Sequence, residues 1–140
     1  MRELAAGSAL LSGWEVADAL LARDAVTALS ALRALLDGGE EAIRILGGLS
    51  WRARTMLQAR AMLEGGAREH DVIRATRSYP YREALMRGMR AYRLEELLAF
   101  PSRLLEADRT LKSRQVDPRA VMESLVLDLI QPTSRSSVAP

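Results

Sequence analysis

Residues 94–130 read LEELLAFPSRLLEADRTLKSRQVDPRAVMESLVLDLI, and two helical patterns meet within this stretch. In the first pattern, residues at steps of three and four share one face of a helix. That face is apolar except for one carboxylate, and it consists of Leu94, Leu97, Pro101, Leu104, Asp108 and Leu111. Lys112 follows Asp108 by one helical turn, so we expect an ion pair between these two side chains.

The second pattern begins at Asp117 and Pro118. Asp117 offers a side-chain oxygen to the free backbone N–H groups of a helix start, and Pro118 suits the first helical position, where no N–H is needed. We therefore predict a helix from Pro118 to Ile130. Pro101 leaves two interpretations of the first pattern: it bends one long helix at Phe100, or the long helix begins there.

The composition favours a helical domain. The chain has 140 residues, which suffices for one domain with a real core, and it has no cysteine, which excludes disulfides and thiolate chemistry. Ala and Leu dominate the apolar residues, and aromatic residues make up only 4% of the chain. No apolar run approaches the roughly 20 residues of a membrane span, and the first residues do not resemble a signal peptide. We expect a soluble, cytoplasmic protein without membrane contact.

Helical periodicity extends over the rest of the chain. Asp24 is the expected N-cap of a helix at residues 25–36, which ends at Gly38–Gly39. The remaining predicted helices are a short one that starts at residue 12 or 13 and buries Trp14, and others at about 40–63, 69–76 and 80–91. The pair Gly47–Gly48 inside the long helix indicates either close packing against another helix or a bend.

These patterns predict an all-α fold, an antiparallel array of about five to seven helices. We expect this domain to cover residues 14–131. Residues 1–13 form a lead that is either a frayed helix or the remnant of an upstream linker. Residues 132–140 are rich in Pro and Ser, and we expect a disordered tail there.

A search for catalytic chemistry finds no constellation. The sequence lacks a phosphate-binding loop, because no paired glycines are followed by the required lysine. His70 is the single histidine, and one imidazole cannot assemble a metal or catalytic site. Asp108 lacks a second acid or a nucleophile nearby, so we interpret it as a buried polar group satisfied by Lys112 or an arginine. We expect no enzyme activity, no metal and no cofactor.

The positive charge is concentrated in residues 51–93, which contain ten arginines and only four acidic residues. Such a segment suits a phosphate backbone or an acidic partner, although solvated helix faces also produce this pattern. The candidate contacts with DNA or a partner are Arg52, Arg60, Arg74, Arg77, Arg82, Arg87 and Arg90. Tyr79, Tyr81 and Tyr92 lie among them and are suited either to stacking on bases or to structural roles.

The order and spacing of several short pieces resemble the C-terminal domain of the delta subunit of the bacterial DNA polymerase III clamp loader. The pieces are residues 16–20 before Asp24, 28–36 with Gly39, 45–49, Arg54 before 56–57, Leu63 with Gly65, 80–82, 94–97, 105–108, 111–113, 117–118 and 125–127. The structural signature within this resemblance is Arg54, Asp108, Lys112, Asp117 and Pro118. We expect Arg54 to pair with Asp108 if their helices pack together.

The resemblance implies a non-catalytic assembly domain. In that family the C-terminal helical domain joins its counterparts from delta prime and tau/gamma in a pentameric collar. The collar holds the clamp-loader pentamer together while the sliding clamp is loaded during DNA replication. The AAA+-like domains that contact the clamp are not part of this chain, so it is either a piece of a longer subunit or a freestanding collar-like protein.

A different class stays open from the residues alone. A freestanding helical protein that binds nucleic acid would use residues 51–93 directly and show strongly salt-dependent DNA binding. The collar interpretation predicts weak or no DNA binding by the isolated chain and association with other loader subunits.

Overall fold

The computed structural model describes residues 13–113 and 115–131. The all-α prediction is confirmed, since the described residues contain helices and no strand. After a helical stretch at residues 13–22, the elements are α2 (Ala25–Asp37), α3 (Ala42–Glu64), α4 (Glu69–Thr76), the 3-10 turn η1 (Tyr79–Tyr81), α5 (Arg82–Ala91), α6 (Leu94–Leu98), α7 (Phe100–Lys112) and α8 (Pro118–Ile130). The lead and tail predicted at residues 1–13 and 132–140 fall outside the described residues, apart from residue 13.

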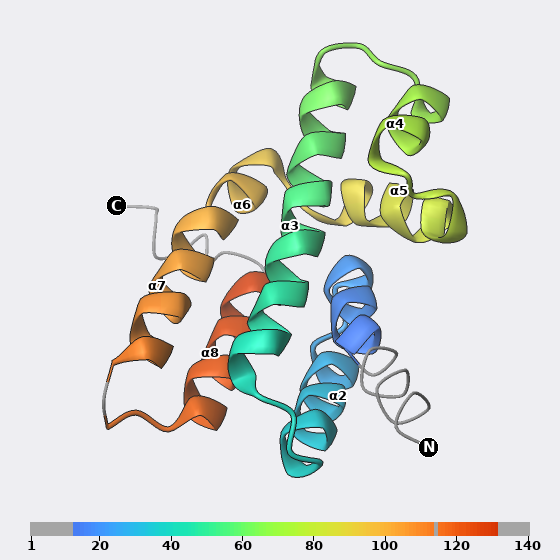
Figure 1. Cartoon of the computed structure of the whole chain (residues 1–140). Coiled ribbons are helices and arrows are strands. Elements are labelled where there is room, and N and C mark those ends of the chain that lie inside the picture. The colour runs from blue at the N-terminus through green and yellow to red at the C-terminus, as the bar shows by residue number, and fades with distance from the viewer. Residues whose placement is uncertain (1–12, 114, 132–140) are drawn as a thin grey trace.

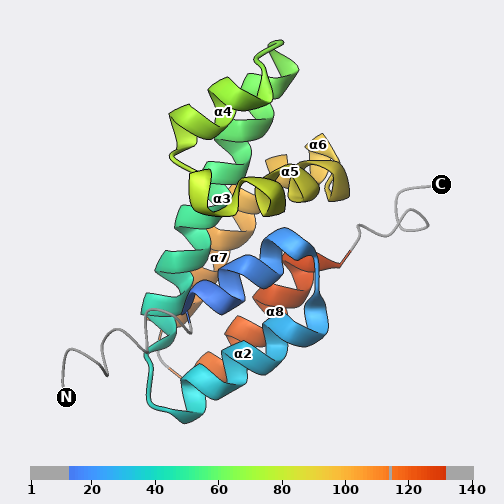
Figure 2. The ribbon, with the colours of Figure 1, turned by 90° about the vertical axis from the view of Figure 1, so that its right-hand side faces the viewer.

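Helix α3 is the axis of the molecule and contacts the five helices that follow it in the chain (Figure 1). Helices α7 and α8 form an antiparallel hairpin on one side of α3. Helix α2 packs against α8, while α4 and α5 lie beside the C-terminal half of α3 (Figures 1 and 2). The arrangement therefore buries one continuous core around α3.

Buried leucine, alanine and methionine side chains from all these helices fill the core. Its fully buried members include Leu21, Leu32, Leu49, Met56, Leu85, Leu97 and Met122. Tyr92 and Phe100 are also buried and meet edge to face, with ring centroids 5.6 Å apart. Because aromatic residues are few, packing between helices depends mainly on aliphatic side chains.

Both predicted N-caps are confirmed. Asp24 accepts hydrogen bonds from the Thr27 hydroxyl at 2.6 Å and from the Thr27 backbone N–H at 3.1 Å, and these bonds lower the pKa of Asp24. Asp117 accepts a hydrogen bond from the backbone N–H of Arg119 at 3.1 Å. Gly39 has φ +95° directly after α2, a conformation that glycine adopts at little cost.

The structure decides between the two interpretations of Pro101. Helix α6 ends at Leu98 and α7 begins at Phe100, so Pro101 lies in the first turn of a new helix. One continuous helix from Leu94 to Leu111 is therefore wrong. Proline is tolerated in a first turn because the N–H it lacks has no helical acceptor there.

One of the two alternatives for Gly47–Gly48, close packing against another helix, and the expected burial of Trp14 are also corrected. A Cβ added at Gly47 or Gly48 would meet nothing within 4 Å, so these glycines do not allow another helix of the described chain to approach closely. Trp14 is 42% exposed instead of buried, and it lies edge to face against Trp51 with ring centroids 6.0 Å apart. The close approach that does require a glycine is at Gly88, where a Cβ would lie 2.8 Å from a Leu21 methyl group.

No helix in the described part of the chain is long and apolar enough to cross a membrane.

Candidate interaction surfaces

The arginines divide into those that hold the fold together and those that face solvent. Arg23 belongs to the first group, in the turn between residues 13–22 and α2, with φ +57°. Its guanidinium forms a bidentate ion pair with Glu96 at 2.6 and 3.0 Å and donates to the Ile130 carbonyl at 2.7 Å. It also donates to the Ala91 carbonyl and lies 4.2 Å from the ring centroid of Tyr92.

This Arg23 site joins the N-terminal turn to the ends of α5 and α8 and to α6. The side chain of Glu96 is only 5% exposed, and it also accepts from the backbone N–H of Arg93 at 2.8 Å. Burial raises the pKa of Tyr92, whose hydroxyl donates to the Leu20 carbonyl beside this site. Sequence reasoning missed Arg23, because its partners are 68 to 107 residues away in the chain.

Arg52 is completely buried, so the prediction that it contacts DNA or a partner is wrong. One of its nitrogens lies 3.0 Å from the Asp18 carboxylate. Its guanidinium lies 4.4 Å from the ring centroid of Tyr81 and 5.3 Å from that of Trp14. Arg52 is therefore a structural residue between two aromatic rings.

Arg60 also serves internal contacts. It donates to the backbone carbonyls of Tyr92, at 2.8 Å, and Met89, and it pairs with Glu64 at 3.3 Å. Its side chain is 16% exposed, so little of it is accessible to a ligand. Tyr92 is buried, which excludes the suggested stacking of this ring on bases.

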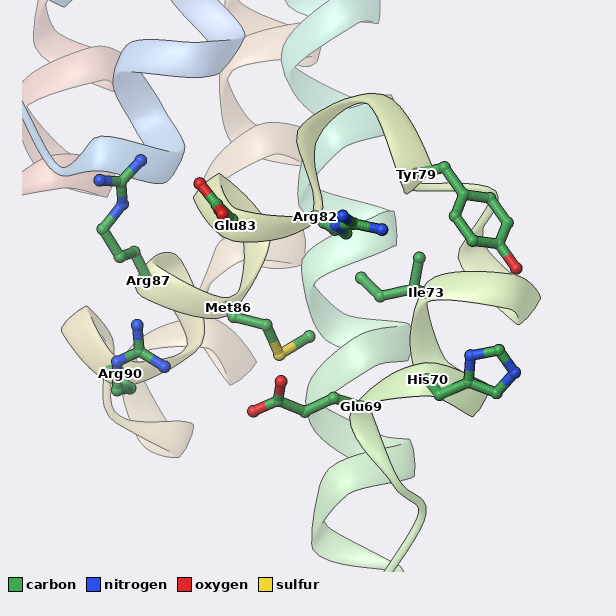
Figure 3. Close-up of a pocket in the computed structure, with 9 residues that line it drawn as sticks. All are labelled: Glu69, His70, Ile73, Tyr79, Arg82, Glu83, Met86, Arg87 and Arg90. Carbon is green, nitrogen blue, oxygen red and sulfur yellow. The ribbon is translucent and has the colours of Figure 1, made fainter.

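The remaining candidate arginines are exposed. Arg82, Arg87 and Arg90 line a cleft of about 530 Å³ between α4 and α5, shown in Figure 3. The other lining residues are Glu69, His70, Ile73, Tyr79, Glu83 and Met86. In this view Arg87 and Arg90 lie on one side of Met86, while His70 and Tyr79 lie on the other. The cleft carries both charge signs, because Glu69 and Glu83 line it together with the three arginines. Neither glutamate forms an ion pair with these arginines within the described residues.

Arg74 and Arg77 lie outside the lining of this cleft. Arg74 is within 2.8 Å of His70 Nε2, one helical turn before it. Arg77 has φ +55° and ends α4. The structure thus brings together three of the seven candidate arginines and separates the others.

The predicted ion pair between Asp108 and Lys112 is present, with 2.9 Å between its charged atoms. The Asp108 side chain is 34% exposed, so the interpretation of Asp108 as a buried polar group is wrong. Arg54 is exposed, and no ion pair joins it to Asp108 in the described residues. Both residues nevertheless line the same groove between α3 and α7.

This α3–α7 groove has a volume of about 520 Å³. Leu46, Ala53 and Leu104 lie at its base and are buried, while Ile43 and Leu105 are 41% and 50% exposed. Gly47 also lines it, and so do Ser50, Leu57 and Pro101. The groove is therefore an apolar surface with one cation and one acid at its edges.

No group of histidine, cysteine, aspartate and glutamate side chains in residues 13–113 and 115–131 is arranged to hold a metal ion. The buried arginines described above form internal contacts, whereas the α3–α7 groove is mainly apolar and the α4–α5 cleft carries three arginines and two glutamates. The fold and these surfaces define a helical domain whose exposed faces are suited to binding other macromolecules.

The particular family follows from comparison with known proteins. The model of the "DNA polymerase III delta subunit, C-terminal domain" matches residues 12–129, so the chain belongs to this family. The family suggested by the sequence is thereby confirmed. A comparison with curated proteins gave no match.

Among solved structures, the fold is similar to that of the Bacillus subtilis DNA clamp loader delta protein (YqeN). The TM-score is 0.69 and the sequence identity is 24%, over 86% of this chain and 36% of that protein. This chain thus spans about a third of the length of that relative.

Proposed function

We propose that this chain is the non-catalytic assembly (collar) domain of a clamp-loader delta subunit in the cytoplasm. It holds the loader pentamer together with delta prime and tau/gamma while the sliding clamp is loaded during DNA replication. The observation that carries this proposal is the family match over residues 12–129. The match spans helices α2 to α8 and stops one residue before the end of α8.

The distribution of apolar side chains supports binding to proteins. Several large apolar residues are exposed in the described part of the chain, among them Trp14, Ile43, Trp51, Leu94, Leu98 and Leu105. Exposed apolar and aromatic groups of this kind form the centres of protein–protein interfaces. An assembly domain needs such faces because each subunit must contact its neighbours.

The alternative is a freestanding nucleic-acid-binding protein, and one observation favours it. Arg82, Arg87 and Arg90 are exposed along one cleft. Against it, Arg52 and Arg60 are engaged inside the fold, and Glu69 and Glu83 lie in the same cleft as the exposed arginines. Fewer accessible cations mean fewer phosphate contacts and weaker binding.

The test is a binding experiment with the full 140-residue chain. The chain is mixed with each purified clamp-loader subunit of the same organism at moderate salt, and separately with primed DNA. We expect stable complexes with loader subunits and weak DNA binding. Tight DNA binding without any loader partner would reject the assembly role and support the alternative.

The DNA experiment includes a charge variant. If the cleft binds DNA, replacing Arg87 and Arg90 together by glutamine should weaken binding and lower the salt dependence by about two phosphate contacts. The matched control replaces Arg33 and Arg44 by glutamine, which removes two charges on α2 and α3 that do not line this cleft. Equal losses in both double variants would indicate non-specific attraction.

A further inference from the structure

The α3–α7 groove combines an apolar base with an open path along α3. Its α3 side is formed by residues at helical steps on one face, Ile43, Leu46, Gly47, Ser50, Ala53, Arg54 and Leu57. Its α7 side is formed by Pro101, Leu104, Leu105 and Asp108. Two packed helices of this kind present a straight channel in which the side chains of a third helix can interdigitate.

The Gly47 position is not explained by contacts within the described chain. A glycine inside a helix is less favourable than alanine by about 1 kcal/mol. A Cβ would meet nothing within 4 Å at Gly47 or at Gly48, so an alanine would fit at either position, and of the two only Gly47 lines the groove. A helix that packs in the groove would give this open position a use, because small residues let two backbones approach closely.

The two charged residues that line the groove differ in whether they have an ion-pair partner. Asp108 is neutralised by Lys112 at 2.9 Å. Arg54 is exposed and forms no ion pair with an acid of the described residues, so the groove presents one free guanidinium at its α3 edge. A carboxylate on the occupant would complement this cation and fix the direction of binding.

We propose that the α3–α7 groove binds an amphipathic helix of another clamp-loader subunit, with an apolar stripe toward Leu46 and Leu104 and a carboxylate opposite Arg54. This inference rests on the proposed assembly function and assigns one face to it. Ile43 and Leu105, exposed in the free domain, are covered in the complex.

The test compares two neighbouring glycines of α3. Gly47→Leu fills the groove, whereas Gly48→Leu places the same side chain on the same helix outside the groove lining. Both positions are exposed and have open space, so both variants should melt at or above the temperature of the parent chain. We expect Gly47→Leu to weaken binding to the loader partner at least tenfold, and Gly48→Leu to change it less than twofold.

A charge variant tests the orientation. Arg54→Glu should weaken the same complex, while Arg44→Glu, which alters an exposed arginine of α3 outside the groove, should leave it unchanged. Replacing the partner carboxylate opposite Arg54 by arginine should restore binding to the Arg54→Glu variant. The same partner variant should not restore binding to Gly47→Leu. Failure of every partner acid to restore it would overturn the proposed salt bridge.

The outcomes separate this inference from the assembly function. If the parent chain binds no loader subunit, the assembly function itself fails. If the parent chain binds and the two leucine variants bind alike, the function stands and the groove assignment is overturned. If Gly47→Leu instead converts a dimer of this chain to a monomer in sedimentation, the occupant is a second copy and the proposed partner is wrong.

Discussion

Arg23, whose side chain is 14% exposed, and Arg52, which is fully buried, both serve internal contacts, yet their surroundings differ. Arg23 has a buried carboxylate and two backbone carbonyls as partners. Arg52 has one carboxylate, that of Asp18, which is 59% exposed, and two of its nitrogens have no hydrogen-bond partner. The Arg23 site is a polar junction, whereas Arg52 is held mainly by the faces of Tyr81 and Trp14.

The cost of removing such an arginine therefore depends on which polar groups are left behind. Without Arg23, the buried Glu96 carboxylate and the Ile130 carbonyl would each lose a donor. Without Arg52, Asp18 would remain hydrated. The four predictions below test this contrast in order of expected size.

Replacing Arg23 by methionine should destabilise the domain most, by about 3 kcal/mol, because the buried Glu96 carboxylate loses its bidentate partner and retains the longer contact with Arg93, at 3.8 Å. Methionine and arginine are equally disfavoured at φ +57°, so the backbone conformation does not account for the loss. Urea unfolding measures the change. Arg33→Met, which removes the exposed ion pair with Glu123, is the control and should cost much less.

High pH should act through Tyr92. Burial raises the pKa of Tyr92 in the folded domain, whereas an unfolded tyrosine ionises at about pH 10. The associated stability is complete below about pH 10 and is lost above it, by roughly 1.4 kcal/mol per pH unit. Unfolding free energies measured from pH 8 to 11.5 should show this decline in the parent and less of it in Tyr92→Phe. An identical alkaline decline in both proteins would contradict the role of Tyr92.

At neutral pH, two tyrosine variants sharpen the comparison. Tyr92→Phe should cost about 1 kcal/mol, because the Leu20 carbonyl loses one of its two donors and keeps the backbone N–H of Arg23, at 3.1 Å. Tyr81→Phe should be neutral or stabilising, because the Tyr81 hydroxyl is buried without a hydrogen-bond partner in the described chain. Thermal melts of the two variants measure the difference, and equal losses would show that burial alone decides the effect.

Arg52→Met should destabilise the domain less than Arg23→Met, by about 1 kcal/mol or less. Methionine keeps apolar packing between the rings and removes two unbonded buried nitrogens, while the cation–π attraction to Tyr81 and Trp14 is lost. The measurement is the same urea titration as for Arg23→Met. A loss as large as that of Arg23→Met would remove the distinction between the two sites.

Local chemistry made much of the fold predictable from the sequence. The helical period located the helices, and Asp24 and Asp117 marked two helix starts because an N-cap acts within a few residues. Pro101 was ambiguous, because proline is compatible with a bend and with a first turn. Only the structure shows that α6 ends at Leu98 and that Pro101 lies in the first turn of α7.

The surfaces were less predictable, because contacts between distant residues leave no local pattern. Arg52 and Arg54 are two residues apart on one helix, yet one is buried and the other exposed. The charge pattern of a segment gives its net charge, but it does not show which side chains point to solvent. No local pattern marks Arg23 either, because Glu96 and Ile130 become its neighbours only in the folded chain.

The bond from Arg23 to the Ile130 carbonyl has a consequence for synthesis on the ribosome. Ile130 lies 107 residues after Arg23, so roughly 5–20 s pass between their translation at 5–20 residues per second. During this time the turn at Arg23 lacks its last acceptor, and the nascent domain stays open at the position that α8 will fill. The core around α3 is therefore completed only after α8 has been synthesised.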